Sequence, residues 1–434
     1  MRLRERLKLI FKKRALRQTG YVAAGSLING ASLFALNIVL ARALDQDLFG
    51  IFSLSVLMLM TVAELSDFGL NMGLLRFAPY YLATNQTDKL KQLVKTIWRW
   101  RVSLTFALTI GGIIFAYPLA KYLFGQVKTT PYLAFASLGI GGVILLGFLS
   151  TYLQSQQRFF YHASVQSLKG FLRLIVVVFF MLIGVKSLFV YLSAYIFVPW
   201  ILFLANYKVF PEKFREVEIE EEVKQKLHSQ LARFSFWLTI SSLISIFASR
   251  IDQIMISRLL GLTEVAIFTV AWQLIQFFPV IYGSITSVLM PKVSSLKTKT
   301  ELTAFVWRAF KWVLAGTLGI AILVYPSQYL INFLFGQKYA AAMPIYLILA
   351  YGYLLNVLVI PFSLVINTYN KTELIAVSGV IQLCINLAGN LVFIPLYGIM
   401  GAAYTFAFSV VVLVMWNVVT ALYLLKKSEL VIEK

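Results

Sequence analysis

Apolar windows of bilayer length recur along the whole chain and are separated by short polar segments. A window of 17 to 25 apolar residues is long enough to cross a membrane as a helix. We therefore predict an all-α polytopic membrane protein with twelve transmembrane helices. The predicted spans cover residues 19–41, 50–75, 98–120, 132–153, 163–184, 188–207, 231–257, 265–290, 303–325, 342–363, 373–394 and 400–425. Pro279 with Gly283 is expected to bend the eighth span, and Pro199 the sixth.

The polar segments divide the chain into two predicted bundles of six helices. Residues 19–207 form the first bundle and residues 231–425 the second, with a cytoplasmic linker at 208–230 whose run of glutamates indicates a solvated segment. Residues 1–18 are basic with leucines at helical spacing, which is typical either of an interfacial helix on anionic lipid or of a basic segment that sets topology. Residues 426–434 form a short tail.

The two bundles are a repeat. When Arg42 is aligned with Arg258, a shift of 216 (258 − 42), the polar positions of the first span fall on those of the seventh without a gap. Further on, the sequence LFGQ at 123–126 recurs at 334–337, and residues 157–158 correspond to 370–371. An even number of spans per repeat means that both repeats cross the membrane in the same direction, and a cavity between them is the expected binding site.

Composition and charge restrict the function. The chain of 434 residues is 60% hydrophobic and only 13% charged, which excludes a soluble globular domain. The net charge of +21 is carried by Lys and Arg beside the spans, so it indicates membrane topology with both termini cytoplasmic, and no nucleic-acid partner is expected. The single cysteine excludes a disulfide framework, and His162 and His228 are expected in loops, so no metal site or cofactor is predicted.

Ionisable and polar residues at membrane depth mark the candidate site. The cationic candidates for binding an anion are Arg173, Lys169, Arg250 and Arg76. The polar candidates for lining the cavity are Asn29, Asn37, Ser242, Ser245, Ser249, Gln253, Gln273 and Gln276. The candidates for coupling to H⁺ or Na⁺ are Glu64, Asp67 and Asp252.

Each group also has a simpler structural explanation. Glu64 and Asp67 either couple to an ion or pair with a nearby arginine to hold helices together, and with Thr61 and Asn71 they are spaced to share one helix face. Arg76, like Arg99 and Arg101, is expected to be a topological anchor at a span end. Arg250 and Asp252 either pair locally or act separately. The serines of the seventh span either line a cavity or permit close helix packing.

Four strings give the chain a family resemblance. ARALDQDLFGIFSL at 41–54, DFGLNMGLLRF at 67–77, the two copies of LFGQ, and NLVFIPLYGIMGAAYTFAFS at 390–409 resemble the Wzx-type polysaccharide flippases of the MATE-like MOP transporter superfamily. The resemblance implies a protein of the bacterial cytoplasmic (inner) membrane. It also implies that an undecaprenyl-diphosphate-linked oligosaccharide moves from the cytoplasmic to the outer leaflet by alternating access. Membrane lipids and polysaccharide polymerase or other assembly proteins are the implied partners.

Other classes of membrane protein fit less well. A multidrug or cation antiporter of the same superfamily is the main alternative, but it calls for a carboxylate-lined cavity, and the first span contains no acid. The loop after the second span lacks the glycine, aspartate and paired-arginine pattern of major-facilitator transporters. A polymerase or ligase would need a substantial external loop, so no enzyme is predicted. The sequence does not exclude passive, scramblase-like transport.

Overall fold

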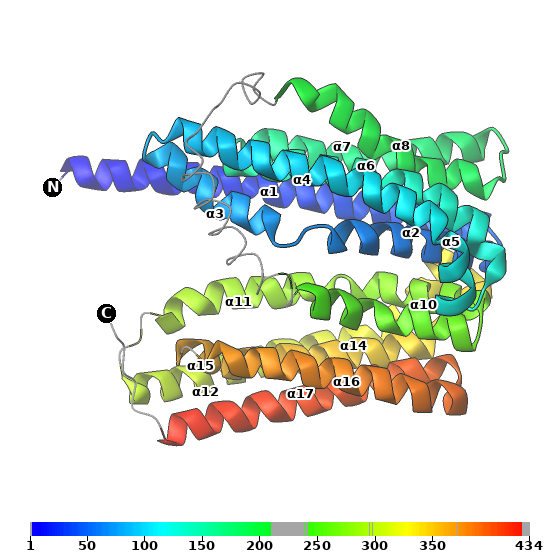
Figure 1. Cartoon of the computed structure of the whole chain (residues 1–434). Coiled ribbons are helices and arrows are strands. Elements are labelled where there is room, and N and C mark those ends of the chain that lie inside the picture. The colour runs from blue at the N-terminus through cyan, green and yellow to red at the C-terminus, as the bar shows by residue number, and fades with distance from the viewer. Residues whose placement is uncertain are drawn as a thin grey trace. The chain divides into compact units, whose positions relative to one another are not determined.

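The chain is almost entirely helical. A computed structural model describes residues 2–209, 239, 242–294, 296, 298–369 and 371–427, and within these ranges every regular element is a helix (Figure 1). Contacts divide the chain into two compact units, Met1–Ile246 and Phe247–Lys434. Most of the predicted linker and the first part of the predicted seventh span lie outside the described residues.

The described part of the first unit contains seven long or medium helices joined by short turns and short helical segments. Its first helix runs without a break through the basic N-terminal segment, where the sequence suggested a separate interfacial helix. The elements are α1 (Arg2–Ala43), α2 (Gln46–Leu65), α3 (Leu70–Ala83), α4 (Thr87–Ile114), α5 (Ala116–Pro118), η1 (Leu119–Leu123), η2 (Val127–Thr129), α6 (Thr130–Ser155), α7 (Phe159–Leu182), α8 (Leu188–Asn206) and η3 (Tyr207–Val209).

The second unit repeats this succession. It begins with the helix over residues 242–259, which continues across the boundary between the two units. The elements that follow are α10 (Leu262–Ile275), α11 (Phe278–Ser294), α12 (Lys299–Ser327), α13 (Tyr329–Phe335), η5 (Gln337–Tyr339), α14 (Ala342–Leu358), α15 (Ile360–Thr368), α16 (Thr372–Tyr397) and α17 (Ile399–Lys427).

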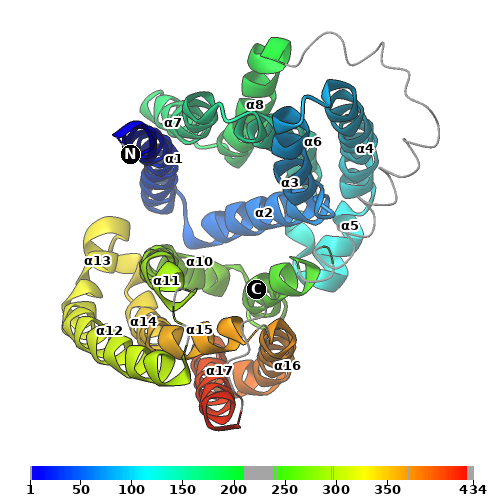
Figure 2. The same cartoon turned by 90° about the vertical axis from the view of Figure 1, so that its left-hand side faces the viewer.

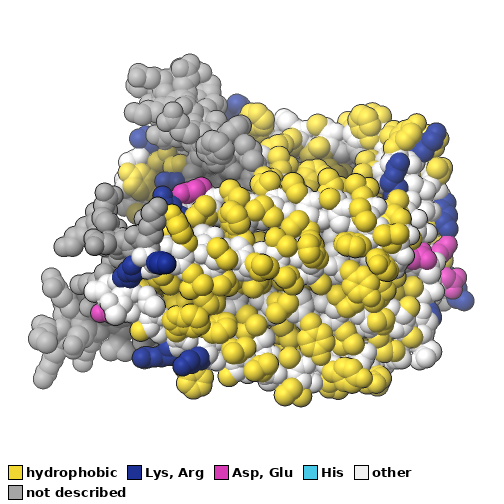
Figure 3. Space-filling model, turned by 90° about the horizontal axis from the view of Figure 1, so that it is seen from below, with side chains coloured by type: hydrophobic (Ala, Val, Ile, Leu, Met, Phe, Trp, Pro, Cys, Tyr) yellow, Lys and Arg dark blue, Asp and Glu magenta, His cyan; other side chains and the backbone are white. Residues whose placement is uncertain are grey.

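The described helices are long and apolar enough for a multi-pass membrane protein. Nine of them pass as single spans by length and composition, and two bent pairs, in α4–η1 and α14–α15, raise the count to eleven in the described part of the chain. These eleven correspond to predicted spans other than the seventh, part of which is not described. On the face shown in Figure 3, hydrophobic side chains cover the middle, and charged side chains lie toward the two ends. That distribution is what a bilayer requires.

The second span of the first unit differs from the prediction of one helix over 50–75. Helix α2 ends at Leu65, and α3 starts at Leu70 after a turn in which Phe68 and Gly69 have φ of 44° and 68°. A left-handed turn of this kind is favourable for glycine and costly for phenylalanine. The expected shared face of Thr61, Glu64, Asp67 and Asn71 is therefore wrong, because helical periodicity does not continue through the turn.

The second span of the other unit is interrupted as well. Helix α10 ends at Ile275 and α11 begins at Phe278, directly before Pro279. Proline cannot donate to the carbonyl one turn earlier, and it disfavours helical backbone at the residue before it. The structure thus has a two-residue break directly before Phe278, and the bend expected at Pro279 and Gly283 stays a prediction. The LFGQ copies also agree, because Gly125 and Gly336 both have positive φ, of 67° and 97°, at the end of a helix.

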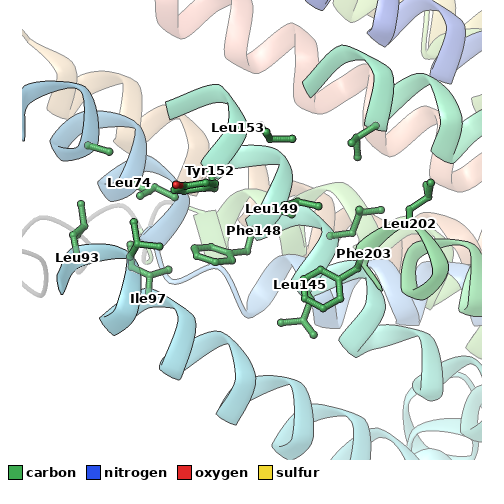
Figure 4. Packing of buried hydrophobic residues seen from close by; sticks show 14 of the residues in the cluster. Leu74, Leu93, Ile97, Leu145, Phe148, Leu149, Tyr152, Leu153, Leu202 and Phe203 are labelled. Carbon is green, nitrogen blue, oxygen red and sulfur yellow. The ribbon is translucent and has the colours of Figure 1, made fainter. Parts of the chain in front are cut away.

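Apolar packing holds each unit together separately. In the first unit, side chains from α3, α4, α6 and α8 interlock around Phe148 and Leu149, with Ile97 and Phe203 beside them (Figure 4). A comparable cluster in the second unit joins α12, α15 and α17. Because lipid tails are as apolar as these side chains, such packing is stabilised by close van der Waals contact more than by removal from water.

Candidate functional site

The polar candidates of the first unit lie along the contact between α1 and α7. The two helices are neighbours over most of their length, as the end-on view in Figure 2 shows. A Cβ atom on Gly25 would lie 2.8 Å from the Cα of Ala163, and one on Gly170 would lie 2.9 Å from the Cα of Asn29. Small residues thus bring the two backbones into direct contact, a common device in membrane helices. This contact fixes the rotation of α7, and hence where its cations point.

Arg173 is buried in the middle of α7 with an incomplete set of partners. Its side chain is 2% exposed, and its guanidinium lies 4.3 Å from the ring centroid of Tyr195, a buried residue of α8. Its Nε and Nη2 atoms have no hydrogen-bond partner in the described structure, where no carboxylate pairs with it either. A desolvated cation over an aromatic ring gains about 2 kcal/mol, whereas each unsatisfied buried donor costs about 1–3 kcal/mol. An oxyanion would satisfy these donors.

Lys169 lies one turn before Arg173 on the same side of α7. It is partly buried, and its Nζ donates to Gln166 Oε1 at 2.8 Å. Gln166 Nε2 donates to Ser150 Oγ of α6 at 3.1 Å, and Ser150 contacts the Nδ1 of His162. The structure thus places His162 in the first turn of α7 instead of in the expected loop, since the helix begins four residues earlier than the predicted span.

Two asparagines of α1 complete the predicted positions in this unit. Asn29 is partly buried, and its Oδ1 is a buried acceptor without a partner in the described residues. Asn37 lies two turns further along, and its Nδ2 donates to the carbonyl oxygen of Leu33 at 2.8 Å. Asn29 therefore lies beside the cations with free bonding capacity, while part of the capacity of Asn37 is used within its own helix.

A second polar cluster holds the turn between α2 and α3. Arg101 of α4 is 2% exposed and donates to the carbonyl oxygen of Ser66 at 3.2 Å, to Asn71 Oδ1 at 3.0 Å, and to the carboxylate of Asp67. The expectation that Arg101 is a topological anchor at a span end is wrong, because its guanidinium is buried and its two Nη atoms bond to the turn. For Asp67 the structure favours pairing with an arginine to hold helices together over coupling to an ion.

The other predicted residues of this region lie apart from that cluster. Glu64 is exposed near the end of α2, and Arg76 is exposed on α3 with its guanidinium 5.6 Å from the ring centroid of Phe77. Neither joins the cations of α7 in the described structure of the first unit. Their roles in coupling and in anion binding stay predictions.

The second unit contains a buried acid. Asp252 is 5% exposed and accepts a hydrogen bond of 2.6 Å from Nδ2 of Asn390 in α16, in place of the local pairing with Arg250 that the sequence left open. The Oδ1 atoms of Asn390 and of Asn386, one turn earlier, are buried acceptors without a partner among the described residues. A carboxylate and two amide oxygens are hard ligands that suit a proton or a small cation.

The remaining predicted residues of the seventh and eighth spans are more accessible. Gln253 donates to Thr269 Oγ1 of α10 at 3.3 Å. Ser242, Ser245, Ser249 and Gln276 are exposed, and Arg250 and Gln273 are partly buried. Whether these side chains line a cavity between the two halves stays a prediction.

Long apolar helices define a multi-pass membrane protein, and solved structures share this fold. An inward-facing multidrug resistance MATE family transporter of the MOP superfamily superposes with a TM-score of 0.74, 14% sequence identity, and coverage of 92% of this chain and 96% of that one. The lipid II flippase MurJ in an inward closed conformation gives 0.70, 12% identity, and coverage of 93% and 91%. At these identities the similarity concerns the fold.

Sequence comparison identifies the family. Residues 15–297 match the model of the polysaccharide biosynthesis protein family, and the chain belongs to that family. An uncharacterized membrane protein of Methanocaldococcus jannaschii is 27% identical over 373 residues, which are 80% of this chain and 72% of that protein. A protein of Shigella flexneri whose name proposes O-antigen transport is 26% identical over 190 residues, 43% of this chain and 45% of that one. The family supports a flippase role.

Proposed function

We propose that the protein moves a diphosphate-linked lipid oligosaccharide from the cytoplasmic to the outer leaflet of a cytoplasmic membrane by alternating access, as a step in surface polysaccharide synthesis. The observation that carries this proposal is Arg173, a buried arginine at membrane depth whose Nε and Nη2 lack a hydrogen-bond partner among the described residues. A buried cation with unsatisfied donors costs free energy unless a ligand accepts hydrogen bonds from those donors. The proposal describes a transporter, not an enzyme, that works beside polymerase and other assembly proteins.

The chemistry of the α7 face suits a diphosphate. A guanidinium binds phosphate oxygens with two parallel N–H groups, and an ammonium adds a compact positive charge. Arg173 and Lys169 supply one of each, one turn apart, and Asn29 adds an acceptor for a sugar hydroxyl. Arg76 and Arg250 would then also bind the diphosphate. Asn37, Gln253, Gln273, Gln276 and the serines of the seventh span would then contact sugars.

The direction of transport follows from charge. Two negative charges moving outward across an inside-negative membrane gain about 2.3 kcal/mol each per 100 mV if no protein charge moves with them. If Arg173 and Lys169 move through the field with the substrate, this gain shrinks, and inward movement of H⁺ or Na⁺ must contribute. Asp252 with Asn390 is the site we assign to that ion, because its carboxylate is buried and bonded to a neutral amide.

Reconstitution tests the proposal. The purified chain is placed in vesicles with a fluorescent undecaprenyl-diphosphate oligosaccharide, and the fraction that a membrane-impermeant quencher reaches is followed over time. We expect protein-dependent flipping that Arg173→Ala suppresses. Flipping of neutral lipids at the same rate would contradict a specific transporter and indicate a scramblase. Transport of cationic drugs without flipping would support the multidrug alternative.

Imposed gradients separate the driving forces. A potential without an ion gradient should accelerate flipping if the substrate charge moves alone, and an H⁺ or Na⁺ gradient should accelerate it if Asp252 couples. A rate that responds to neither would contradict active transport by this protein.

A further inference from the structure

Gln166 lies between the lysine of the α7 face and the neighbouring helix α6. Its Oε1 accepts from Lys169 Nζ at 2.8 Å, and its Nε2 donates to Ser150 Oγ at 3.1 Å. With His162, Lys169 and Arg173 it forms a series at positions 162, 166, 169 and 173, the spacing of one helix face. One side of α7 is thus polar from its first turn to the middle of the membrane.

The direction of the Gln166 amide is determined by chemistry. An ammonium has donors only, so the atom that faces Lys169 must be the amide oxygen, and the amide nitrogen must face Ser150. The Nδ1 of His162 lies 3.0 Å from the carbonyl oxygen of Ser150, which can only accept, and 2.9 Å from its Oγ. Nδ1 therefore carries a hydrogen, and His162 and Ser150 hold the far end of Gln166 in place.

A neutral amide is an unusual sole partner for a lysine within a membrane span. Lys169 has no carboxylate partner among the described residues, and Gln166 supplies one neutral acceptor for its three donors. A charged phosphate oxygen makes a stronger hydrogen bond to an ammonium than an amide oxygen does. An arriving diphosphate would therefore displace Gln166 from Lys169, whereas a carboxylate in that place would neutralise the lysine permanently.

We propose that Gln166 is a positioning residue that holds the Lys169 ammonium in the empty transporter and yields it to the diphosphate. This inference rests on the proposed function. In each transport cycle Gln166 must release Lys169 to the ligand. An uncharged side chain beside the lysine allows this release. A purely structural role would instead favour the strongest possible bond at this position.

Two substitutions of similar size distinguish these roles. Gln166→Glu keeps an acceptor beside Lys169 and adds a charge, and Gln166→Met removes the acceptor. We measure the affinity of the full-length protein in lipid nanodiscs for undecaprenyl diphosphate, with thermal unfolding of each variant as a check on folding. We expect Gln166→Glu to weaken binding about tenfold, since its carboxylate competes with the ligand at close range, and Gln166→Met to change it less than about threefold.

The substitution that weakens binding more distinguishes a positioning role from a structural one. If Gln166→Met weakens binding more than Gln166→Glu does, the role is structural and the inference fails. If Gln166→Met does not fold, Gln166→Asn withdraws the oxygen by one methylene and takes its place. In a Lys169→Met background, Gln166→Glu should have no further effect, and an undiminished effect there would overturn the inference. Failure of the unaltered protein to bind undecaprenyl diphosphate would instead contradict the proposed function itself.

Discussion

The two units carry opposite buried charges on different members of an equivalent pair of helices. In the first unit, α7 carries Lys169 and Arg173, and α1 contributes Leu36 at the position that aligns with Asp252. In the second unit, α16 carries Gln382 and Asn386 at the positions that align with those cations by a shift of 213 (370 − 157), and the helix over 242–259 carries the acid. One repeat thus places two cations on α7, and the other places a buried acid at residue 252, two positions after the partly buried Arg250.

One charge in each unit bonds to a neutral amide. Lys169 donates to Gln166, and Asp252 accepts from Asn390. An amide reduces the cost of the charge without cancelling it, so the charge stays available to a ligand. By contrast, the Arg101–Asp67 pair combines opposite charges and fixes a turn. The comparison separates charges that are held for a ligand from charges that hold the fold.

The largest expected effect concerns the pair that fixes the turn. Arg101→Met removes the buried guanidinium from the turn and leaves Asp67, which is 28% exposed, without its counter-ion, so we expect a cost of about 3 kcal/mol, the lower end for a broken buried pair. We expect a strongly lowered melting temperature of the purified protein in lipid nanodiscs. Glu64→Gln, at an exposed position on the same side of the turn, is the control and should leave the melting temperature nearly unchanged. An unaltered melting temperature for Arg101→Met would contradict a structural role of the Arg101–Asp67 pair.

The next effect concerns the cation of the first unit. Arg173→Ala should reduce flipping about a hundredfold, equal to about 2.7 kcal/mol at about 1.4 kcal/mol per tenfold, while the protein still reaches the membrane. Arg173→Lys should recover part of the rate, because an ammonium supplies charge but not the two parallel donors. Lys121→Ala is the control, since Lys121 also lies over tyrosine rings, at 5.2 and 5.7 Å, but is exposed. Equal rates for Arg173→Ala and Lys121→Ala would contradict the assignment.

Asp252, the acid of the second unit, should affect coupling to an ion gradient more than binding of the lipid diphosphate. We expect Asp252→Asn to abolish acceleration by an H⁺ or Na⁺ gradient, a change of about tenfold if coupling contributes about 1.4 kcal/mol, and to leave affinity for undecaprenyl diphosphate intact. Arg173→Ala should show the reverse pattern, with lost affinity. The two units would not be functionally distinct if both substitutions reduced affinity and coupling to the same degree.

The last effect concerns the stability of the contact between α1 and α7. A Cβ on Gly25 would lie 2.8 Å from the backbone of Ala163, so Gly25→Ala forces the helices apart at a cost of about 1–3 kcal/mol. Gly20→Ala, in the same helix with nothing within 4 Å of the added atom, should be neutral or slightly stabilising. Melting temperatures of the two variants test this, and equal values would indicate that the helices separate easily.

The sequence by itself determined the all-helical membrane fold, with nine to eleven of the expected spans in the described residues, and the presence of buried charges in α7 and near residue 252. These follow from hydropathy and periodicity, which act over one helix at a time. The turn at Phe68 and Gly69 escaped the prediction because its residues are as apolar as a continuous helix would be. His162 was misplaced because the helix start lies outside the apolar window.

Tertiary structure decided which charges meet. Asp67 and Arg101 are 34 positions apart, and Asp252 and Asn390 are 138 apart, so no local pattern indicates that either pair is in contact. The same packing leaves Arg173 over Tyr195, with no carboxylate partner among the described residues. Hydropathy shows that a charge lies within the membrane, but only the packing of α4, α8 and α16 shows whether it is paired, and that determines whether it stabilises the fold or awaits a ligand.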